Sequence, residues 1–225
     1  MFCTKSLPYA WGAQDGSKLG NALTNFVAVS NPIKVPFANG VNIADIATEY
    51  GGVYALDANG SGLFAWGNYY DGSNTVSSPT SLKSKLPQGA NFTSIVGGEK
   101  TLYLLKQNGT VWSFGEGSDG QCGDGSTQDC RNSATQVALP NDTNITKIAS
   151  NYNSQIALAL DINGKVYGWG KQGYEELANG EKESVEATPI ELNISTATGW
   201  YYDANITDID VGLTILRFKM IEAMF

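Results

Sequence analysis

The sequence predicts an all-β fold built from repeated sheet units, and three observations lead to that prediction. An aromatic residue followed by glycine recurs at intervals of 48 to 55 residues; the pairs are Trp11-Gly12, Trp66-Gly67, Phe114-Gly115 and Trp169-Gly170. The 225 residues include 26 glycines and only 16% charged residues, as is typical of short strands joined by tight turns. Hairpin turn signals also recur at one place in the repeat. A period near fifty is typical of β-propeller blades, which cannot bury both faces alone.

The first element after each aromatic-glycine pair is a short extended segment. These segments are residues 32–35, 79–82, 134–137 and 189–192. Three of the four begin with proline, which suits the start of a strand because no ladder donor is needed there. We therefore expect one short strand from each of them.

The second element is a strand whose apolar residues are spaced three apart among polar neighbours. It occurs at residues 43–47, 92–96, 145–149 and 206–210. The third element is a hairpin, with arms predicted at 53–57 and 63–66, at 102–106 and 110–114, and at 156–161 and 165–169. Its turns carry Asn59-Gly60, Asn108-Gly109 and Asn163-Gly164, the pair that accepts positive φ in tight hairpins.

Some hairpin arms are apolar on both faces. Residues 101–105 and 155–160 do not alternate between apolar and polar side chains. Such strands belong to sheets that are covered on both sides. A sheet stacked between two neighbouring sheets has this property. We expect few helices, and the best candidate for a helical segment is a turn at 175–181.

These repeated elements, taken together, resemble the repeat of the regulator of chromosome condensation family. The best copy runs through Ser118–Gly125, Ile148-Ala149, Ile156–Asp161, Asn163-Gly164 and Val166–Gly170. The resemblance implies a β-propeller that presents loops to protein partners. Members include exchange factors for small GTPases, chromatin-associated proteins and bacterial inhibitors of other enzymes. The family's unit usually carries a histidine where this chain has Gly52, Thr101 and Ser154, and its rings usually have seven blades, more than this chain supplies.

The repeated elements predict a single β-propeller-like domain over residues 1–225, with about four blades of antiparallel strands. The repeat units are 12–66, 67–114, 115–169, and 170–225 completed by 1–11. The N-terminal strand around Trp11 lacks a preceding hairpin arm, and the C-terminal unit lacks its closing strand. We expect the first strand to complete the last blade, which removes exposed sheet edges. Two alternatives stay open: a larger ring completed by a second chain, and a truncated gene product.

The charge balance narrows the class of partner. The net charge is −8, from 22 acidic and 14 basic residues, so no basic stripe for nucleic acid is expected. No apolar run approaches the roughly 20 residues that a membrane span needs, so we expect no membrane insertion. Residues 1–8 do not resemble a secretory signal. The charge favours a protein partner with a basic surface.

Cysteine usage bears on the compartment. Cys3, Cys122 and Cys130 form no framework or zinc spacing, so we expect reduced thiols, with Cys122 as a buried hydrophobe where the family repeat usually has leucine. This predicts a cytoplasmic or otherwise intracellular protein. The alternative is a secreted or cell-surface protein, which seven glycosylation sequons favour, at Asn59, Asn91, Asn108, Asn141, Asn144, Asn193 and Asn205.

Catalysis has little support in the sequence. The chain contains no histidine, which excludes histidine-based triads and histidine metal sites. Four acids follow aromatic-glycine pairs, namely Asp15, Asp71, Asp119 and Asp124, and we expect them to shape turns. A propeller glycoside hydrolase using loop carboxylates is the enzymatic alternative. We predict no enzyme activity, no cofactor and no metal site.

The candidate binding residues are aromatic side chains in loops, with neighbouring acids. They are Tyr69, Tyr70, Tyr174, Trp200, Tyr201, Tyr202, Glu175 and Glu176. Aromatic side chains are enriched at interface hot spots, although they also pack between loops. The predicted function is a non-catalytic interaction scaffold, or a subunit of a larger assembly. A guanine-nucleotide exchange factor or regulator of a small GTPase is the alternative that the resemblance adds.

Overall fold

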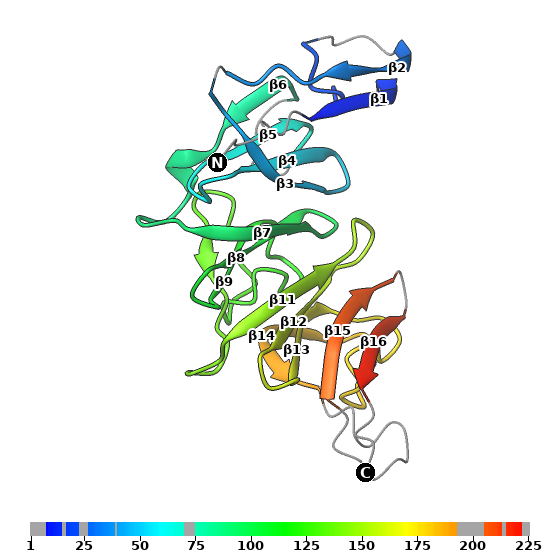
Figure 1. The fold of residues 1–225 in the computed structure, drawn as a ribbon. Coiled ribbons are helices and arrows are strands. Elements are labelled where there is room, and N and C mark those ends of the chain that lie inside the picture. Colours follow the sequence, from blue (N-terminus) through cyan, green and yellow to red (C-terminus); the bar gives the residue numbers. More distant parts are fainter. Residues whose placement is uncertain are drawn as a thin grey trace.

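The chain is all-β, as predicted. The structure is a computed structural model that describes residues 8–14, 17–22, 27–38, 40–69, 75–192, 205–212 and 215–221. The only helical element in these residues is the short 3-10 helix η1 (Lys83–Lys85). The array of sheets is shown in Figure 1. The strands are β1 (Tyr9–Gln14), β2 (Val27–Lys34), β3 (Ile43–Thr48), β4 (Gly52–Asp57), β5 (Leu63–Gly67), β6 (Val76–Ser81), β7 (Phe92–Gly97), β8 (Thr101–Lys106), β9 (Val111–Gly115), β10 (Thr135–Gln136), β11 (Ile145–Ser150), β12 (Ile156–Asp161), β13 (Val166–Lys171), β14 (Val185–Glu191), β15 (Asn205–Val211) and β16 (Leu216–Ile221).

Three sheets are complete propeller blades with four antiparallel strands each. Their strand orders are β3-β4-β5-β6, β7-β8-β9-β10 and β11-β12-β13-β14, so each is a simple meander. The predicted Asn-Gly hairpins are confirmed as the turns between the second and third strands. At their centre Gly60, Gly109 and Gly164 have φ values of 68°, 77° and 82°, the left-handed region that glycine enters without steric cost.

The sequence repeat and the sheet are offset by one strand. The extended segment that opens each repeat pairs with the hairpin of the repeat before it: Gly67 lies opposite Val76, and Gly170 lies opposite Glu186. Each repeat therefore places strands in two sheets. This offset links neighbouring blades through the chain itself, in addition to the packing between them.

The two remaining sheets contain two strands each, and they lie at opposite ends of the array (Figure 1). The irregularities in their registers identify the strands. β1 and β2 shift between Ala10 and Gly12, as β5 and β6 do between Ala65 and Gly67. They are therefore the third and fourth strands of a blade.

The other pair is the complementary half. β15 and β16 shift register between Ile206 and Asp208, as β3 and β4 do between Ile43 and Asp45. They are therefore the first and second strands of a blade. The expected pairing of the N-terminal strand with the C-terminal blade is wrong for this structure, because β1 pairs with β2 at the far end from β16. The two sheets lie at opposite ends of the array, so β1 and β16 do not meet (Figure 1).

The core lies between successive sheets, as predicted for strands apolar on both faces. Each first strand packs an isoleucine against the sheet before its own. These residues are Ile95 of β7, Ile148 of β11 and Ile209 of β15. First strands of neighbouring sheets also bond directly, since the amide of Ile95 donates to Oδ2 of Asp45 at 2.9 Å. Burial of these side chains is the main force that holds the sheets together.

Candidate partner-binding face

The meander topology gives the array two different faces. One side of the array carries the turns between first and second strands and the loops between third and fourth strands. The Asn-Gly turns lie on the other side. We call the first side the loop face; its described parts are residues 49–51, 98–100, 151–155, 116–134 and 172–184. The opposite side is the hairpin face, with the turns at 58–62, 107–110 and 162–165.

The turns of the loop face are joined from sheet to sheet by backbone hydrogen bonds. The amide of Tyr50 donates to the carbonyl of Glu99 at 3.0 Å. The amide of Glu99 in turn donates to the carbonyl of Ser154 at 3.1 Å. Three consecutive sheets therefore present their turns as one connected surface.

A tryptophan fixes the loop that precedes its own sheet. The indole Nε1 of Trp66 donates to the carbonyl of Lys18 at 2.8 Å, and that of Trp169 donates to the carbonyl of Gln121 at 3.0 Å. In both pairs the partners are 48 residues apart. These two tryptophans thus bind the Gly-rich loop of their own repeat, which belongs to the preceding sheet.

Glycine is required where each ring closes on its loop. Gly20 and Gly123 have φ values of 64° and 66°, and a Cβ on either would lie within 3.0 Å of the indole nitrogen of Trp66 or Trp169. The ring occupies the space that a side chain would take. This explains why the loops are glycine-rich at that position.

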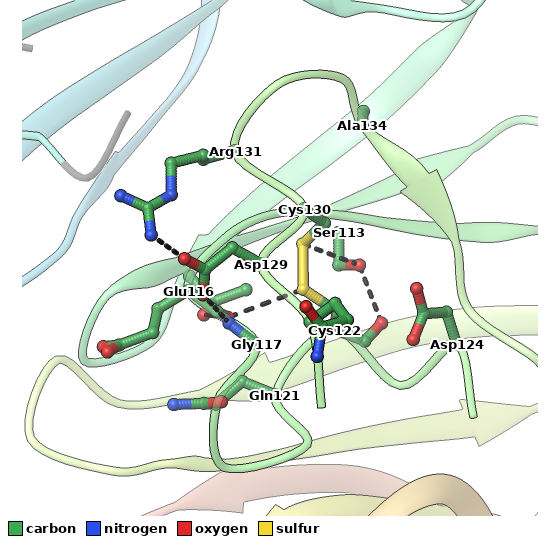
Figure 2. The surroundings of a disulfide bond; sticks show 12 residues. Ser113, Glu116, Gly117, Gln121, Cys122, Asp124, Asp129, Cys130, Arg131 and Ala134 are labelled. Carbon is green, nitrogen blue, oxygen red and sulfur yellow. Dashed lines mark hydrogen bonds and ion pairs between the residues drawn. A yellow bond between two sulfur atoms is a disulfide. The ribbon is translucent and has the colours of Figure 1, made fainter. Parts of the chain in front are cut away.

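The 116–134 loop is closed by a disulfide between Cys122 and Cys130, eight residues apart with Cα atoms separated by 6.3 Å (Figure 2). The hydroxyl of Ser113 donates to the carbonyl of Cys122 at 2.7 Å beneath the bridge. The expectation of reduced thiols at these two positions was wrong. The spacing of the two cysteines did not predict the bridge. They meet because the loop folds back onto β9, where the amide of Cys130 donates to the carbonyl of Gly115 and both cysteine side chains are buried.

Asp119 binds this loop to the next sheet. Its carboxylate accepts from Nε2 of Gln155 at 2.8 Å and forms an ion pair with Lys171 at 3.2 Å. Asp124 has a local role, since its Oδ1 accepts from the amide of Ser126 at 2.9 Å. Asp124 is a turn-shaping acid as expected, whereas Asp119 connects two sheets. The other two acids of this series, Asp15 and Asp71, lie outside the described residues.

The 172–184 loop is held by side chains that point into it. Gln172 is fully buried; its Nε2 donates to Oδ1 of Asn179 at 2.7 Å, and its Oε1 accepts from the amide of Leu177 at 2.9 Å. Oε2 of Glu176 accepts from the amides of Gly173 and Tyr174 at 2.9 and 2.7 Å. Glu176 therefore shapes the loop, and the loop backbone is ordered before any partner arrives.

Three tyrosines project from the loop face. Tyr174 is 77% exposed on the loop just described, and Tyr50 and Tyr152 are 65% and 51% exposed on first-to-second turns. Tyr50 and Tyr152 occupy the same place in their sheets, two residues after the first strand. Neither residue was predicted from the sequence; their shared position is the signal that could have identified them.

Comparison with known proteins identifies the repeat. Residues 108–158 match the family model of the regulator of chromosome condensation (RCC1) repeat. The chain contains an RCC1 repeat. It is 28% identical over 187 residues to human E3 ubiquitin-protein ligase HERC2, an alignment that covers 79% of this chain and 4% of HERC2. An RCC1 repeat-containing protein of Dictyostelium discoideum is 31% identical over 114 residues, which cover 50% of this chain and 22% of that protein.

Solved structures show the same fold. The RCC1-repeat chain aligns with the crystal structure of Kap60 bound to yeast RCC1 (Prp20) with a TM-score of 0.68 and 20% identity, over 92% of this chain and 48% of that one. Prp20p from Saccharomyces cerevisiae gives a TM-score of 0.67 at 20% identity, over 92% and 50%. The RCC1-repeat chain thus spans about half of these propellers and much less of its curated relatives.

The sequence-predicted site residues of this RCC1-repeat protein are not brought together. Tyr69 is 5% exposed and packs edge-on against Tyr54, with ring centroids 5.9 Å apart, so it belongs to the core and not to an exposed cluster. Tyr174 and Glu175 are exposed on one loop, and Glu175 forms an ion pair with Lys182 at 3.4 Å. Tyr70, Trp200, Tyr201 and Tyr202 lie outside the described residues.

Within the described residues of the chain, no group of three histidine, cysteine or acidic residues is arranged to hold a metal ion. In that same part, no helix has the length and hydropathy needed to cross a membrane.

Proposed function

We propose that this chain is a non-catalytic interaction module whose loop face binds a protein with a basic surface. The observation that carries the proposal is the set of three exposed tyrosines, Tyr50, Tyr152 and Tyr174, on one braced face. Tyrosine offers a large contact area at low entropy cost and is enriched at interface hot spots.

Preorganisation supports the proposal. Tyr174 lies on a loop whose backbone amides are already satisfied by Glu176 and Gln172. Tyr50 and Tyr152 lie on turns that are bonded to one another through Glu99 and Ser154. Because the backbone of this surface is already ordered, binding loses little conformational entropy there. More of the free energy of the aromatic contacts then appears as affinity.

Charge gives the class of partner. The chain carries a net charge of −8, and exposed acids surround Tyr174 on the same loop, including Glu175, Glu181 and Glu183. Such a surface attracts basic proteins and repels the backbone of nucleic acids. The solved structure of Prp20p is described with its binding properties to Gsp1p and histones, and histones are basic proteins of this kind.

The experiment measures binding of purified core histones by calorimetry at two salt concentrations. A triple variant, Tyr50→Ala with Tyr152→Ala and Tyr174→Ala, should raise Kd by about tenfold or more. The control is Ile162→Ala, an equally exposed apolar side chain on the hairpin face, which should leave Kd unchanged. Equal effects of the triple variant and the control would contradict the proposal, as would the absence of binding at low salt.

Two other functions make different predictions. Exchange-factor activity, which the family resemblance suggests, predicts faster release of bound nucleotide from a small GTPase when the chain is added. Glycoside hydrolysis predicts turnover of a glycan panel that an Asp119→Asn variant abolishes. Asp119 argues against the second, since its carboxylate is already engaged by Gln155 and Lys171.

The disulfide bears on the compartment in which this module works. Disulfides persist in oxidising compartments, and sequons are glycosylated in the secretory pathway. The bridge between Cys122 and Cys130, together with exposed sequon asparagines at Asn59, Asn91, Asn108, Asn141 and Asn144, supports a secreted or cell-surface protein over an intracellular one. A mass loss on enzymatic deglycosylation of the native protein tests this; an unmodified mass and free thiols contradict it.

A further inference from the structure

The sequon asparagines of this chain gather on the hairpin face. Some lie in its turns, and the others lie in the connections 82–91 and 137–144 between one sheet and the next. These connections leave from the same side because a four-stranded meander begins and ends there. The side chains are exposed at Asn59 and Asn108 in the turns, and at Asn91, Asn141 and Asn144 in the connections. Asn205 opens β15, a first strand, on this side as well, and Asn193 lies outside the described residues.

The loop face carries asparagines but no sequon in its described parts. Its asparagines are Asn132, Asn151, Asn153 and Asn179, and the second residue after each is alanine, asparagine, glutamine and glutamate, in that order. A sequon needs serine or threonine at that place. The acceptors for N-linked glycans are therefore on the side of the molecule opposite to the exposed tyrosines.

Backbone hydrogen bonds bring the acceptors together in pairs, one pair at each of two junctions between sheets. The residue after Asn91 donates its amide to the carbonyl of the residue after Asn59 at 2.9 Å. The residues after Asn144 and Asn108 make the same contact at 3.0 Å. Each junction thus carries two acceptors side by side on the hairpin face.

The fold accommodates these sequons without requiring them. The third complete blade forms the same kind of hairpin turn with Asn163-Gly164-Lys165, and the first complete blade opens its first strand after Asn42 with Ile43-Ala44. Both places keep the asparagine and lack the hydroxyl residue. Where a first strand has threonine there, its hydroxyl adds a hydrogen bond of 3.2 or 3.3 Å to the second strand, which the first complete blade does without.

We propose that the hairpin face is the N-glycosylated side of the molecule, and that its glycans leave the loop face as the side open to protein partners. The proposal rests on the secretory compartment and the loop-face binding proposed above. An N-linked glycan is bulky and hydrophilic, so it needs a position at the surface. Carbohydrate at two junctions covers much of the hairpin face and leaves the tyrosines of the opposite side uncovered.

The group transferred is an oligosaccharide from a lipid diphosphate donor. Nδ2 of the asparagine bonds to the anomeric carbon of the sugar, the bond from that carbon to the diphosphate oxygen breaks, and the amide loses one proton. The folded sites fit the product. At Asn108 the hydroxyl of Thr110 donates to Oδ1 at 2.8 Å, so the oxygen faces the turn. At Asn91 Nδ2 donates to Oε1 of Gln107 at 2.6 Å, and a glycosylated amide keeps one N–H for this bond.

The experiment maps glycans on the native protein. Enzymatic release in heavy-oxygen water converts each occupied asparagine to labelled aspartate, which peptide mass spectrometry locates. Asn163 is the matched control, because its Asn-Gly turn deamidates spontaneously like that of Asn59 but lacks a sequon. The expected result is label above the level of Asn163 at the hairpin-face sequons and none above it on the loop face. Label at no hairpin-face sequon overturns the proposal.

One added glycan on each face tests the effect on binding. Asn153→Thr creates a sequon at Asn151, beside the exposed Tyr152, and Lys165→Thr creates one at Asn163. Both variants are made by secretory expression, and intact mass selects the molecules that carry the extra glycan. Asn153→Thr should lose binding of core histones, whereas Lys165→Thr should keep the Kd of the unsubstituted glycoprotein. Equal effects overturn the proposal that the glycans leave the loop face open. Mapping does not depend on histones, so glycans without histone binding refute the function proposed above and not the glycosylated face.

Discussion

The indole of Trp169 donates a 3.0 Å hydrogen bond to the carbonyl of Gln121, across the boundary between two sheets. Trp66 and Lys18 repeat this contact two sheets earlier at 2.8 Å, with the same separation of 48 residues. The aromatic-glycine pairs are therefore more than a mark of the repeat. The rings of Trp66 and Trp169 hold the Gly-rich loop of the preceding sheet, which lies in the same sequence repeat, and these loops form part of the loop face.

Replacement of Trp169 by phenylalanine tests the hydrogen bond. Trp169→Phe removes the indole donor from the buried carbonyl of Gln121, which keeps the hydroxyl of Tyr103 as a donor at 3.1 Å, and shrinks a buried ring; it should lower the free energy of unfolding by about 2 kcal/mol. Urea unfolding measures the change. The control is Trp112→Phe, since Nε1 of Trp112 has no hydrogen-bond partner within the described residues. An equal loss in the two variants would show that ring size, and not the hydrogen bond, matters.

A second prediction separates backbone strain from ring contact. Gly123 and Gly89 have nearly the same φ, 66° and 65°, but a Cβ would lie 2.7 Å from the indole nitrogen of Trp169 at the first and would meet nothing within 4 Å at the second. Gly89→Ala should cost about 1 kcal/mol from left-handed strain alone. Gly123→Ala should cost about 1 to 3 kcal/mol more because the buried ring must move. Equal costs by chemical denaturation would refute the ring-closure argument.

The disulfide predicts a dependence of stability on reductant. Reduction of the bond between Cys122 and Cys130 should lower the free energy of unfolding by about 2 to 3 kcal/mol, the value for so short a closed loop in the chain-entropy account. The thermal midpoint should therefore fall when a reductant is added. The Cys122→Ala, Cys130→Ala double variant should start lower and be unaffected by reductant. A midpoint that ignores reductant in both proteins would show that the bridge is not formed in solution.

The ion pair between Lys147 of β11 and Asp208 of β15 predicts an acid dependence. The hydrogen bond from Lys147 lowers the pKa of the Asp208 carboxyl below its ordinary value. A depressed pKa stabilises the folded state above the unfolded pKa of about 4, and this stabilisation is lost as the pH falls through the lower folded value. Asp208→Asn should thus be less stable than the unsubstituted protein at neutral pH, with the difference shrinking towards pH 2. Lys147→Met should behave alike; a difference that stays constant with pH would disprove the linkage.

Much of the fold was predictable because strand pairing follows local signals. The Asn-Gly turns placed all three complete hairpins, and the spacing of isoleucines placed the first strands. The composition of each sheet was not predictable in the same way. The strand from Val76 to Ser81 carries no local mark that it joins the sheet before it, because that choice depends on long-range packing.

The site was predicted less well, since exposure is a property of the assembled sheets. Tyr69 and Tyr174 both follow a Trp-Gly pair closely, yet Tyr69 turns into the core against Tyr54 while Tyr174 stays on the surface. Cys122 was correctly expected to be buried at the leucine position of the repeat. Its bond to Cys130 was missed because the path of the loop depends on contacts with the next sheet. Trp169 of that sheet donates to the loop, and Asp119 of the loop pairs with Lys171 of that sheet.

Hydrogen exchange mass spectrometry of the chain with and without bound core histones tests the central claim most directly. The account predicts slower exchange on binding at residues 49–51, 151–155 and 172–184 of the loop face, and unchanged exchange in the hairpin-face turns at 58–62, 107–110 and 162–165. Protection confined to the hairpin face, or to neither face, would contradict it.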